Sequence, residues 1–235
     1  MEKKKKAEME ESSDKTYWKK KSIFFELPYW ENNLIRHNLD VMHIEKNVCD
    51  NKLWTLLGVV GKSKDNLKAR RDFEDLGLRK PLHPQQQGAT KVYLPPTCFT
   101  MNKVNKDVFL KVLKSVKVPD GYASNISRCV RMKEHTIFGL KSHDSHKLMQ
   151  QLLPLVARRA LPKNVVEALI ELSNFFRQLC SKVNLTSDLE NIQDRIGLTL
   201  CHLEKIFPMS FFDVMEHLPI HLAEEALISG PVQFR

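Results

Sequence analysis

The stretch His37-Asn-Leu-Asp-Val-Met-His-Ile-Glu-Lys-Asn-Val-Cys-Asp-Asn51 interleaves polar and apolar side chains in a helical pattern. Asn38 can cap such a helix at its N-terminus, and Gly58 can end it just after Leu57. A helix with this many polar groups must place some of them near its buried face, where an unpaired charge is costly. Buried groups of this kind usually meet a metal, an opposite charge or a substrate, so we expect functional residues here.

The polar candidates on this helix are Asp40, His43, Glu45, Asn47 and Asp50. Residues four apart share a helix face, so His43 and Asn47 should lie together while Glu45 points elsewhere. Glu45 can be a metal-binding carboxylate or an ordinary surface residue, and the spacing alone favours the surface. Asp40 and Asp50 are each five residues from Glu45, a net rotation of about 140°, so neither shares its face.

The composition limits the classes of protein to which the chain can belong. Its 235 residues suffice for one large domain or two small ones, and 42% hydrophobic residues are enough for a core. No run of about 18 apolar residues occurs, so we expect no membrane span. Met1–Lys21 lacks the apolar core of a signal peptide, which argues against secretion. The 5 cysteines include no Cys-x-x-Cys pair, which indicates free thiols in a reducing compartment.

Sequence motifs for small-molecule chemistry are absent. No nucleophile elbow, phosphate-binding loop or dinucleotide fingerprint occurs, so we expect no small-molecule substrate and no cofactor for this chain alone. Two histidine pairs have metal-ligand spacing: His143 with His146, and His217 with His221. Such pairs also arise by chance, and Pro219 interrupts the second pair. Structural or surface histidines are the simpler interpretation, and we assign no metal site.

Positive charge is concentrated in the middle of the chain. The net charge is +9, and residues 61–133 alone hold 16 Lys/Arg against 6 Asp/Glu, a net +10. A concentrated basic region is typical of proteins that bind a polyanion such as DNA, although a solvated basic surface has the same composition. We assign candidate nucleic-acid contacts to nine of these residues: Lys62, Lys64, Lys68, Arg70, Arg71, Lys103, Lys106, Lys111 and Lys114.

Composition divides the chain into five segments. They are a lysine-rich tail expected to be disordered (1–22), a segment with two helices (23–80), a proline-rich loop or linker (81–100), a basic connecting region (101–138) and a helical domain (139–235). Ile23–Leu27 reads as a short extended piece, because Pro28 disfavours helix before it. Two lysine clusters in the tail, Lys3–Lys6 and Lys19–Lys21, can act as a nuclear import signal, so we expect a nuclear protein, or otherwise a cytoplasmic one.

The predicted fold class is mainly α, a helical array or bundle. A helix from Ser63 or Asp65 should end at Gly77, and Pro119-Asp120-Gly121 should form a turn. An amphipathic basic helix is predicted from valines spaced by four: Val104, Val108, Val112 and Val116. The later helices are predicted at Ser142–Leu153, ended by Pro154; from Pro162 or Lys163 to Leu179; at Thr186–Phe207; and at Ser210–Glu225, interrupted near Pro219. We expect residues 139–235 to fold on their own.

Several blocks of sequence carry a resemblance to a known family. They are Phe25–Trp30, His37–Asn51, Lys64–Arg70, Lys80–Pro84, Gly139–Asp144, Leu148–Pro154, Ser210–Asp213 and His217–Leu222. Through them, the run from Phe24 to Arg235 resembles the C-terminal part of a plant CACTA-type (En/Spm) transposon transposase. The half after about residue 139 resembles a helical domain of unknown function that follows the transposase core in these elements.

The resemblance implies an RNase H-like core in which three acidic residues hold two divalent metals, Mg²⁺ in a complete transposase. By this resemblance, residues 23–80 are a remnant of that core, and Glu45 corresponds to the last of the three acidic residues. The strands and the two earlier carboxylates would lie upstream. We therefore expect a fragment of a transposase gene or a truncated gene model, which has no catalytic activity by itself because one carboxylate cannot hold two metals.

Three functions follow as hypotheses. The first is a non-catalytic, transposon-derived protein whose residues 61–133 contact DNA non-specifically or contact other transposon-encoded proteins. The second is a helical protein-interaction module with no nucleic-acid role. The third is a metal-dependent nuclease, which would need two further carboxylates within metal reach of Glu45. Salt-dependent DNA binding separates the first hypothesis from the second.

Overall fold

The structure is a computed structural model that describes residues 20–89, 91–117 and 125–232. Most of the predicted disordered tail and the predicted turn at residues 119–121 lie outside the described residues. The chain divides into two compact units, residues 1–37 and 38–235. The first unit contains one 3-10 turn, η1 (Ile23–Glu26), where we predicted an extended piece. That prediction was wrong because Pro28 restricts only Leu27, which is extended, while the Ser22 hydroxyl accepts a hydrogen bond from the Phe24 amide and caps the turn.

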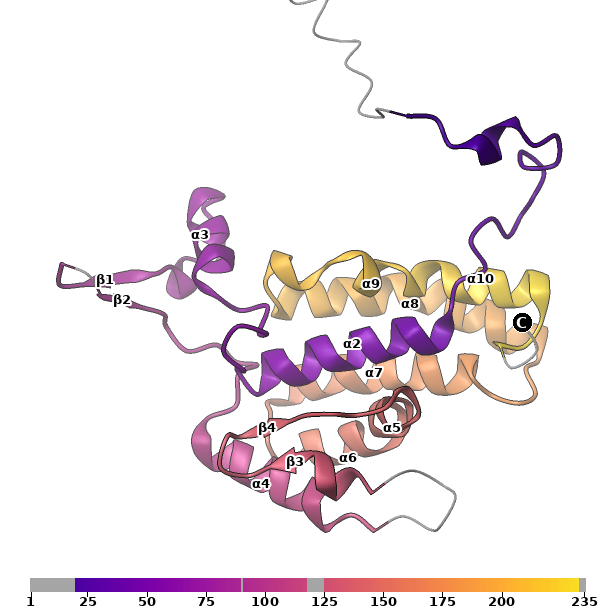
Figure 1. Cartoon of the computed structure of the whole chain (residues 1–235). Helices are drawn as coiled ribbons and strands as arrows, with labels where there is room; N and C mark the ends of the chain where they lie inside the picture. The colour runs from indigo at the N-terminus through magenta and orange to yellow at the C-terminus, as the bar shows by residue number, and fades with distance from the viewer. Residues whose placement is uncertain (1–19, 90, 118–124, 233–235) are drawn as a thin grey trace, which may run out of the picture. The chain divides into compact units, whose positions relative to one another are not determined.

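Residues 38–235 are mainly helical, as predicted (Figure 1). The longer helices are α2 (Val41–Leu56), α3 (Leu67–Asp75), α4 (Lys103–Ser115), α7 (Lys163–Leu179), α8 (Thr186–Ile206) and α10 (Pro219–Ser229). Shorter helical pieces are η2 (Lys80–Leu82), η3 (Ile126–Cys129), α5 (Ser142–Lys147), η4 (Leu148–Leu152), α6 (Leu153–Ala157), η5 (Met209–Phe211) and α9 (Val214–His217). Among the described residues, no helix is long and apolar enough to cross a membrane.

The strands form two small antiparallel pairs. β1 (Gln85–Gln87) pairs with β2 (Lys91–Tyr93), with Gln85 opposite Tyr93, so part of the predicted proline-rich loop is a hairpin. β3 (Val130–Arg131) pairs with β4 (Thr136–Ile137). In the described part of the chain these two pairs are the whole of the sheet structure. The RNase H-like remnant at the N-terminal side is therefore not shown.

The start of α2 differs by a few residues from the prediction. The cap is Asp40, whose Oδ1 accepts a hydrogen bond of 3.0 Å from the His43 amide. Asn38 instead has a left-handed backbone with φ of 43°, which suits an asparagine but lies outside the helix. Gly58, with φ of +58°, follows the last turn as predicted.

The valine spacing gave the wrong buried face for α4. Val104 is 69% exposed and Val108 is 38% exposed. The side chains that α4 buries are Phe109, Leu110 and Leu113. A strict spacing of four drifts by about 40° per step around a helix of 3.6 residues per turn, so the four valines spread around the helix, and Val112 packs against the core while Val104 does not.

Pro154 does not end a helix. The five residues Leu148–Leu152 form a π-helical turn between α5 and α6, and Pro154 then occupies the first turn of α6. A proline is tolerated in the first turn of a helix because its missing amide hydrogen would be unpaired there in any case. Pro219 likewise opens α10, which confirms the predicted interruption.

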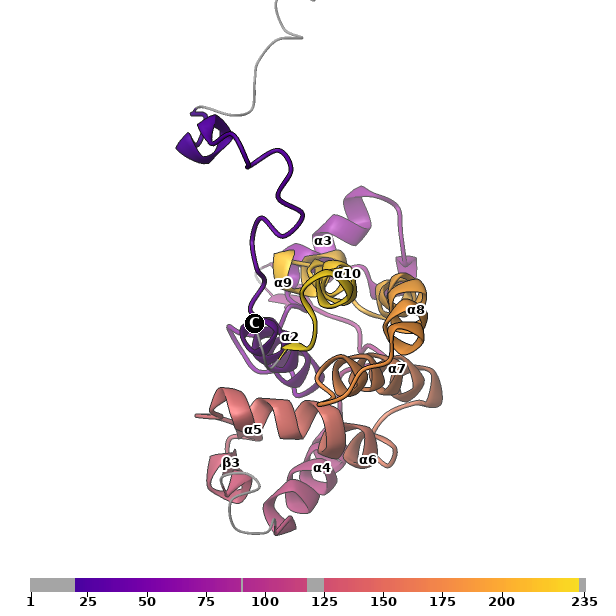
Figure 2. The ribbon, with the colours of Figure 1, turned by 90° about the vertical axis from the view of Figure 1, so that its right-hand side faces the viewer.

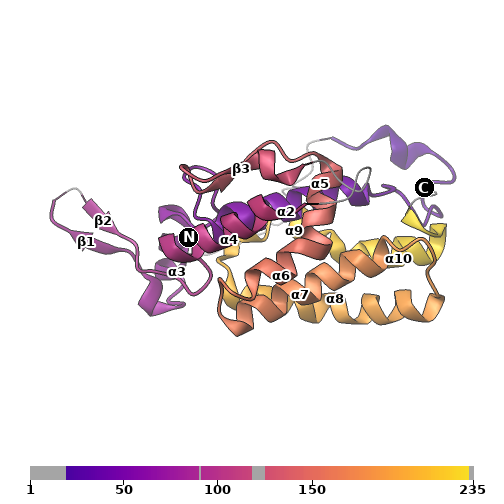
Figure 3. The same ribbon diagram turned by 90° about the horizontal axis from the view of Figure 1, so that it is seen from below.

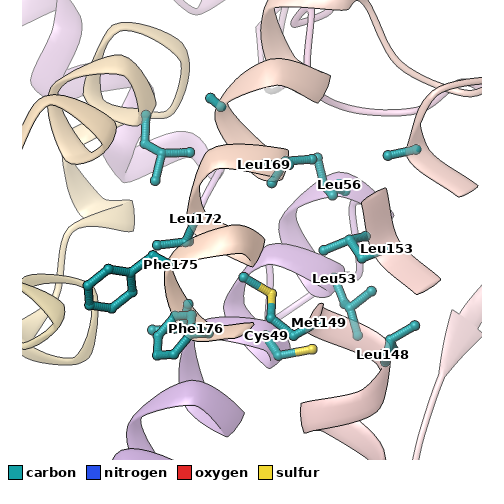
Figure 4. Close-up of a cluster of buried hydrophobic side chains, with 14 of the residues drawn as sticks. Cys49, Leu53, Leu56, Leu148, Met149, Leu153, Leu169, Leu172, Phe175 and Phe176 are labelled. Carbon is teal, nitrogen blue, oxygen red and sulfur yellow. The ribbon is translucent and has the colours of Figure 1, made fainter. Parts of the chain in front are cut away.

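The core of residues 38–235 lies around α2 and α7. These two helices are placed between α8, α9 and α10 on one side and α4, α5 and α6 on the other (Figures 1 and 2). Seen from below, α6, α7 and α8 lie next to one another (Figure 3). Apolar side chains of α2, of the segment from η4 to α6, and of α7 meet in one cluster, which includes Cys49, Leu53, Leu56, Leu148, Met149, Leu153, Leu169, Leu172, Phe175 and Phe176 (Figure 4).

Candidate functional site

The structure buries Glu45, so the interpretation of Glu45 as a surface residue was wrong. Only 1% of this residue is exposed. The cause is the position of α2, which packs against α5 and the π-helical turn and turns the Glu45 side chain toward them. His43 and Asn47 share another face, as predicted, where Asn47 Nδ2 donates a hydrogen bond of 2.8 Å to the His43 carbonyl.

The buried carboxylate of Glu45 meets a histidine and a glutamine. Its Oε2 lies 2.6 Å from His146 Nδ1 and accepts a hydrogen bond of 3.4 Å from Gln150 Nε2. Gln150 Nε2 also donates to the Phe176 carbonyl at 3.2 Å. Burial raises the pKa of Glu45, and the hydrogen bond and charge of His146 oppose that rise. The other oxygen, Oε1, is buried and finds no hydrogen-bond donor among the described residues.

Cys180 completes this group from a third helix. It is the C-cap residue of α7 and is half-buried. One ligand atom each from Glu45, His146 and Cys180 lie within 4.8 Å of one another. Within residues 20–89, 91–117 and 125–232 this is the single group of three or more His, Cys, Asp or Glu side chains that are so close. We call these three residues the Glu45 cluster.

The two histidine pairs that the sequence singled out have different environments. His146 turns to Glu45, and its ring lies 6.4 Å from that of His143. In the second pair, the Nε2 atoms of His217 and His221 are 3.3 Å apart on exposed residues. The carboxylate that meets His146 Nδ1 therefore comes from α2.

The other carboxylates of α2 are bound elsewhere. Asp40 caps the helix, and Asp50 Oδ2 accepts a hydrogen bond of 2.6 Å from Lys46 Nζ. In the described residues, then, the group of metal-ligand side chains around Glu45 contains a single carboxylate. A two-metal nuclease site of the kind the resemblance implies needs several.

A second buried polar pair joins α2 to α9. Lys52 Nζ donates to Glu216 Oε2 at 2.6 Å, and both side chains are 0% exposed. Burial lowers the pKa of Lys52 and raises the pKa of Glu216, and the attraction between the two opposes both changes. The sequence analysis did not single out either residue. The signal was present only as one more polar residue on the helix α2, which does not identify its partner.

Asp213 connects the helices α2 and α9 to Lys64, which lies near the start of the basic residues 61–133. Its Oδ2 accepts hydrogen bonds from Lys64 Nζ at 2.8 Å and from Asn51 Nδ2 at 3.2 Å. Its Oδ1 accepts from the amide of Met215 at 3.0 Å and so caps α9. Burial tends to raise the pKa of Asp213, but the hydrogen bond and charge of Lys64, together with hydrogen bonds from the Glu216 amide and Asn51, hold it below the ordinary value.

Several of the nine predicted DNA-contacting residues are already engaged within the protein. Arg70 is 1% exposed and donates to Asp65, to the Leu82 carbonyl at 2.9 Å and to the Pro95 carbonyl at 3.1 Å. Lys64 is paired with Asp213, as described above. Lys106 is half-buried, and burial lowers its pKa.

Lys62 lies over aromatic rings instead. Its Nζ is 4.6 Å from the ring centre of Trp54 and 5.1 Å from that of Phe138. Arg131 lies on the same Phe138 ring at 5.2 Å. The lysine itself remains exposed, so its charge is still accessible from solvent.

The other predicted DNA-contacting residues are exposed, but they lie in two separate places. Lys68 and Arg71 lie on α3, whereas Lys103, Lys111 and Lys114 lie on α4. The two helices are on opposite sides of α2 (Figures 1 and 2). The basic segment is therefore not one continuous patch, because α2 and its loops separate its two halves.

The half around α4 gains further cations from the segment that packs against it. η3 and β3 contact α4, and together with β4 they form what we call the α4 lobe, residues 103–117 and 125–137. Its exposed basic residues are Lys103, Lys111, Lys114, Lys117, Arg128, Arg131 and Lys133. Among the described residues, none of the seven takes part in an ion pair. Asp107 of the lobe is occupied by His135 at 2.9 Å.

Comparison with known families finds one match, at the C-terminal end of the chain. Residues 179–235 match the model of a domain of unknown function, DUF4218. The match covers α8, α9 and α10, together with Asp213, Glu216 and Cys180. No curated protein matches the chain. No solved structure matches it either.

Proposed function

We propose that this chain is derived from a CACTA-type (En/Spm) transposase and binds duplex DNA without sequence preference, through the α4 lobe and without catalysis. The observation that carries the proposal is the set of seven exposed cations on that lobe, none of which has an ion-pair partner among the described residues. The resemblance of the sequence blocks to the transposase family supports the origin. The domain of unknown function at residues 179–235 is compatible with it.

The physical basis is the release of counterions. Each phosphate that a lysine or arginine neutralises frees condensed cations, and this favours binding whatever the base sequence. Dissociation constants of about 10⁻⁴ to 10⁻⁶ M at physiological salt are typical of such contacts. We expect the unpaired cations of the α4 lobe to contribute most, because Arg70 and Lys64 would first have to break contacts within the protein.

The surroundings of Glu45 support the absence of catalysis. The Glu45 side chain is buried against His146 and Gln150, and the described residues place no second carboxylate in its group. Phosphodiester cleavage by two metals needs metals about 3.5–4 Å apart, held by several carboxylates. We therefore expect no nicking of supercoiled DNA in Mg²⁺ or Mn²⁺.

The test is fluorescence anisotropy of a labelled duplex of random sequence, titrated with the full chain at several salt concentrations. The triple variant Lys103→Gln, Lys111→Gln, Lys114→Gln should reduce the slope of log K against log salt by about 2–3, since each contacted phosphate contributes about 0.9. A matched control removes three exposed cations away from the lobe, Lys182→Gln, Arg195→Gln and Lys205→Gln, and should leave the slope nearly unchanged.

Two outcomes would count against the proposal. Equal loss in both triple variants would mean that net charge, and not the α4 lobe, drives binding. No binding at about 50 mM salt would leave the second hypothesis, a helical protein-interaction module whose partners include other transposon-encoded proteins.

A further inference from the structure

We propose that Glu45, His146 and Cys180 bind one transition-metal ion, and that zinc is the ion that fits best. This inference is independent of DNA binding, because the three residues lie outside the α4 lobe. They come from α2, α5 and the C-terminal end of α7, three helices that meet in the core. A metal there would join segments that are more than 100 positions apart in the chain.

The spacing of the ligand atoms is close to that of a zinc site. Bonds of about 2.0–2.3 Å in tetrahedral geometry place nitrogen, oxygen and sulfur ligands roughly 3.3–3.5 Å apart. In the structure one atom from each residue lies within 4.8 Å of the other two, and Glu45 Oε2 is 2.6 Å from His146 Nδ1. An ion bound between them would lengthen the contact between Glu45 Oε2 and His146 Nδ1 toward this spacing.

The unpaired oxygen of Glu45 is a second, independent observation. Its Oε1 is buried and has no hydrogen-bond donor among the described residues. A buried polar atom without a partner destabilises the folded state, and a charged group does so more strongly. A bound cation would supply the partner that this oxygen lacks.

The types of donor atom select the kind of metal. Carboxylate oxygen, imidazole nitrogen and thiolate sulfur together are typical of zinc and related transition metals. Mg²⁺ prefers oxygen ligands in octahedral geometry, so the Glu45 cluster does not fit the magnesium that the transposase resemblance implies. The structure thus gives Glu45 a different set of partners from the one its family match implies.

The surroundings would complete and orient the site. Gln150 Nε2 donates to both Glu45 Oε2 and the Phe176 carbonyl, so it fixes the orientation of the carboxylate. Such second partners of a metal ligand strengthen binding. The side chain of His146 is 16% exposed, so the cluster is not sealed from solvent.

Cobalt is the first probe, because a thiolate ligand gives Co²⁺ a characteristic charge-transfer absorption. The full chain, stripped with a chelator and dialysed, should bind one Co²⁺ with that absorption, and Zn²⁺ should displace it. Cys180→Ser should abolish the thiolate band, whereas Cys201→Ser and Cys98→Ser, at exposed cysteines, should keep it. Glu45→Gln and His146→Ala should weaken Zn²⁺ binding by more than the roughly 10–100-fold that is typical of losing an outer partner.

A second measurement uses the unmodified protein, so it tests the proposal even where the variants fail to fold. Zn²⁺ should protect Cys180 from alkylation, as mapped by mass spectrometry, while Cys98 and Cys201 react as before. No stoichiometric binding of Co²⁺ or Zn²⁺ would overturn the proposal. It would also be overturned by a thiolate band that survives in Cys180→Ser, or by Zn²⁺ protection that is absent at Cys180.

Discussion

Lys52 Nζ and Glu216 Oε2 form a hydrogen-bonded ion pair of 2.6 Å, with both side chains fully buried and 164 positions between them. Removing two charges from water has a high free-energy cost, and the attraction between them offsets that cost only where the two groups are close and well aligned. The pair therefore adds little net stability compared with apolar side chains of the same size. We expect its main effect to be the selection of one alignment of α2 on α9, since any other would leave one charge buried alone.

Breaking the Lys52–Glu216 pair from one side should be far more harmful than replacing both partners. We expect Glu216→Leu to lower the free energy of unfolding by about 3–5 kcal/mol, because it leaves the Lys52 charge buried and unpaired. Lys52→Met combined with Glu216→Leu should recover most of that loss. Urea unfolding of the two variants, with Glu224→Leu at an exposed position of α10 as control, measures the difference. A double variant as unstable as the single one would refute this explanation.

The same pair changes the expectation for residues 139–235. Without α2, that segment would keep Glu216 but lose Lys52, and would expose the apolar surface that Leu53 and Leu56 cover. We expect a fragment that begins at Gly139 to lose its cooperative thermal transition, and a fragment of residues 38–235 to retain it. Circular dichroism melts of the two fragments compare them directly. A cooperative melt of the shorter fragment would restore the original expectation that it folds alone.

Arg70 and its neighbour Arg71 offer a matched pair of substitutions. Arg70→Lys removes the planar fork that binds Asp65 and reaches the Leu82 and Pro95 carbonyls. We expect a loss of about 1.5–3 kcal/mol, the size of a hydrogen bond to a charged group. Arg71→Lys, at an exposed position, should stay within about 0.5 kcal/mol of the unmodified protein. Chemical unfolding gives both values, and equal losses would contradict the buried role of Arg70.

Asp213 should make stability depend on acid pH in a defined direction. Burial raises the pKa of Asp213, but Lys64, the Glu216 amide and Asn51 together hold its folded-state pKa below the ordinary value of 3.8. The folded state therefore binds this proton less tightly than the unfolded state. The resulting stability is present above pH 3.8 and is lost as the pH falls through the folded pKa. Asp213→Asn keeps a capping side chain at the start of α9 but has no charge to titrate.

The measurement is the difference in Tm between the unmodified protein and Asp213→Asn. We expect the unmodified protein to melt at the higher temperature at neutral pH, and the difference to shrink below pH 3.8. Lys64→Met should reduce the neutral-pH difference, since it removes the charge that lowers the pKa. A difference that grows toward low pH would have the wrong sign for this explanation.

The two sides of α4 should respond differently to substitution. Leu113→Ala opens a cavity at a fully buried position and should cost about 2–5 kcal/mol. Val104→Thr, at a position that is 69% exposed, should change stability by no more than about 0.5 kcal/mol. Thermal unfolding of both variants checks the assignment of the buried face. If the valines spaced by four formed the buried face of α4, Val104 would be the sensitive position instead.

Local signals in the sequence were enough to predict where most of the helices lie. The starts and ends of α7 and α8 follow from apolar periodicity and from the proline that precedes or follows each helix, and Pro219 was correctly placed at an interruption. These features depend on residues within one or two turns, so they can be read without the rest of the chain. The valines of α4 show the limit of this reasoning, because the spacing of small apolar residues does not identify the side that larger ones bury.

The partners of the polar residues on α2 were decided only by the tertiary structure. The sequence of α2 alone indicates that some polar groups must be buried, and it even places Glu45 on a different face from His43. It cannot indicate that Glu45 meets His146, 101 positions away, or that Lys52 meets Glu216. Which helices cover each face of α2 depends on how the apolar surfaces of all the helices pack together, and this is a property of the whole core and not of one segment.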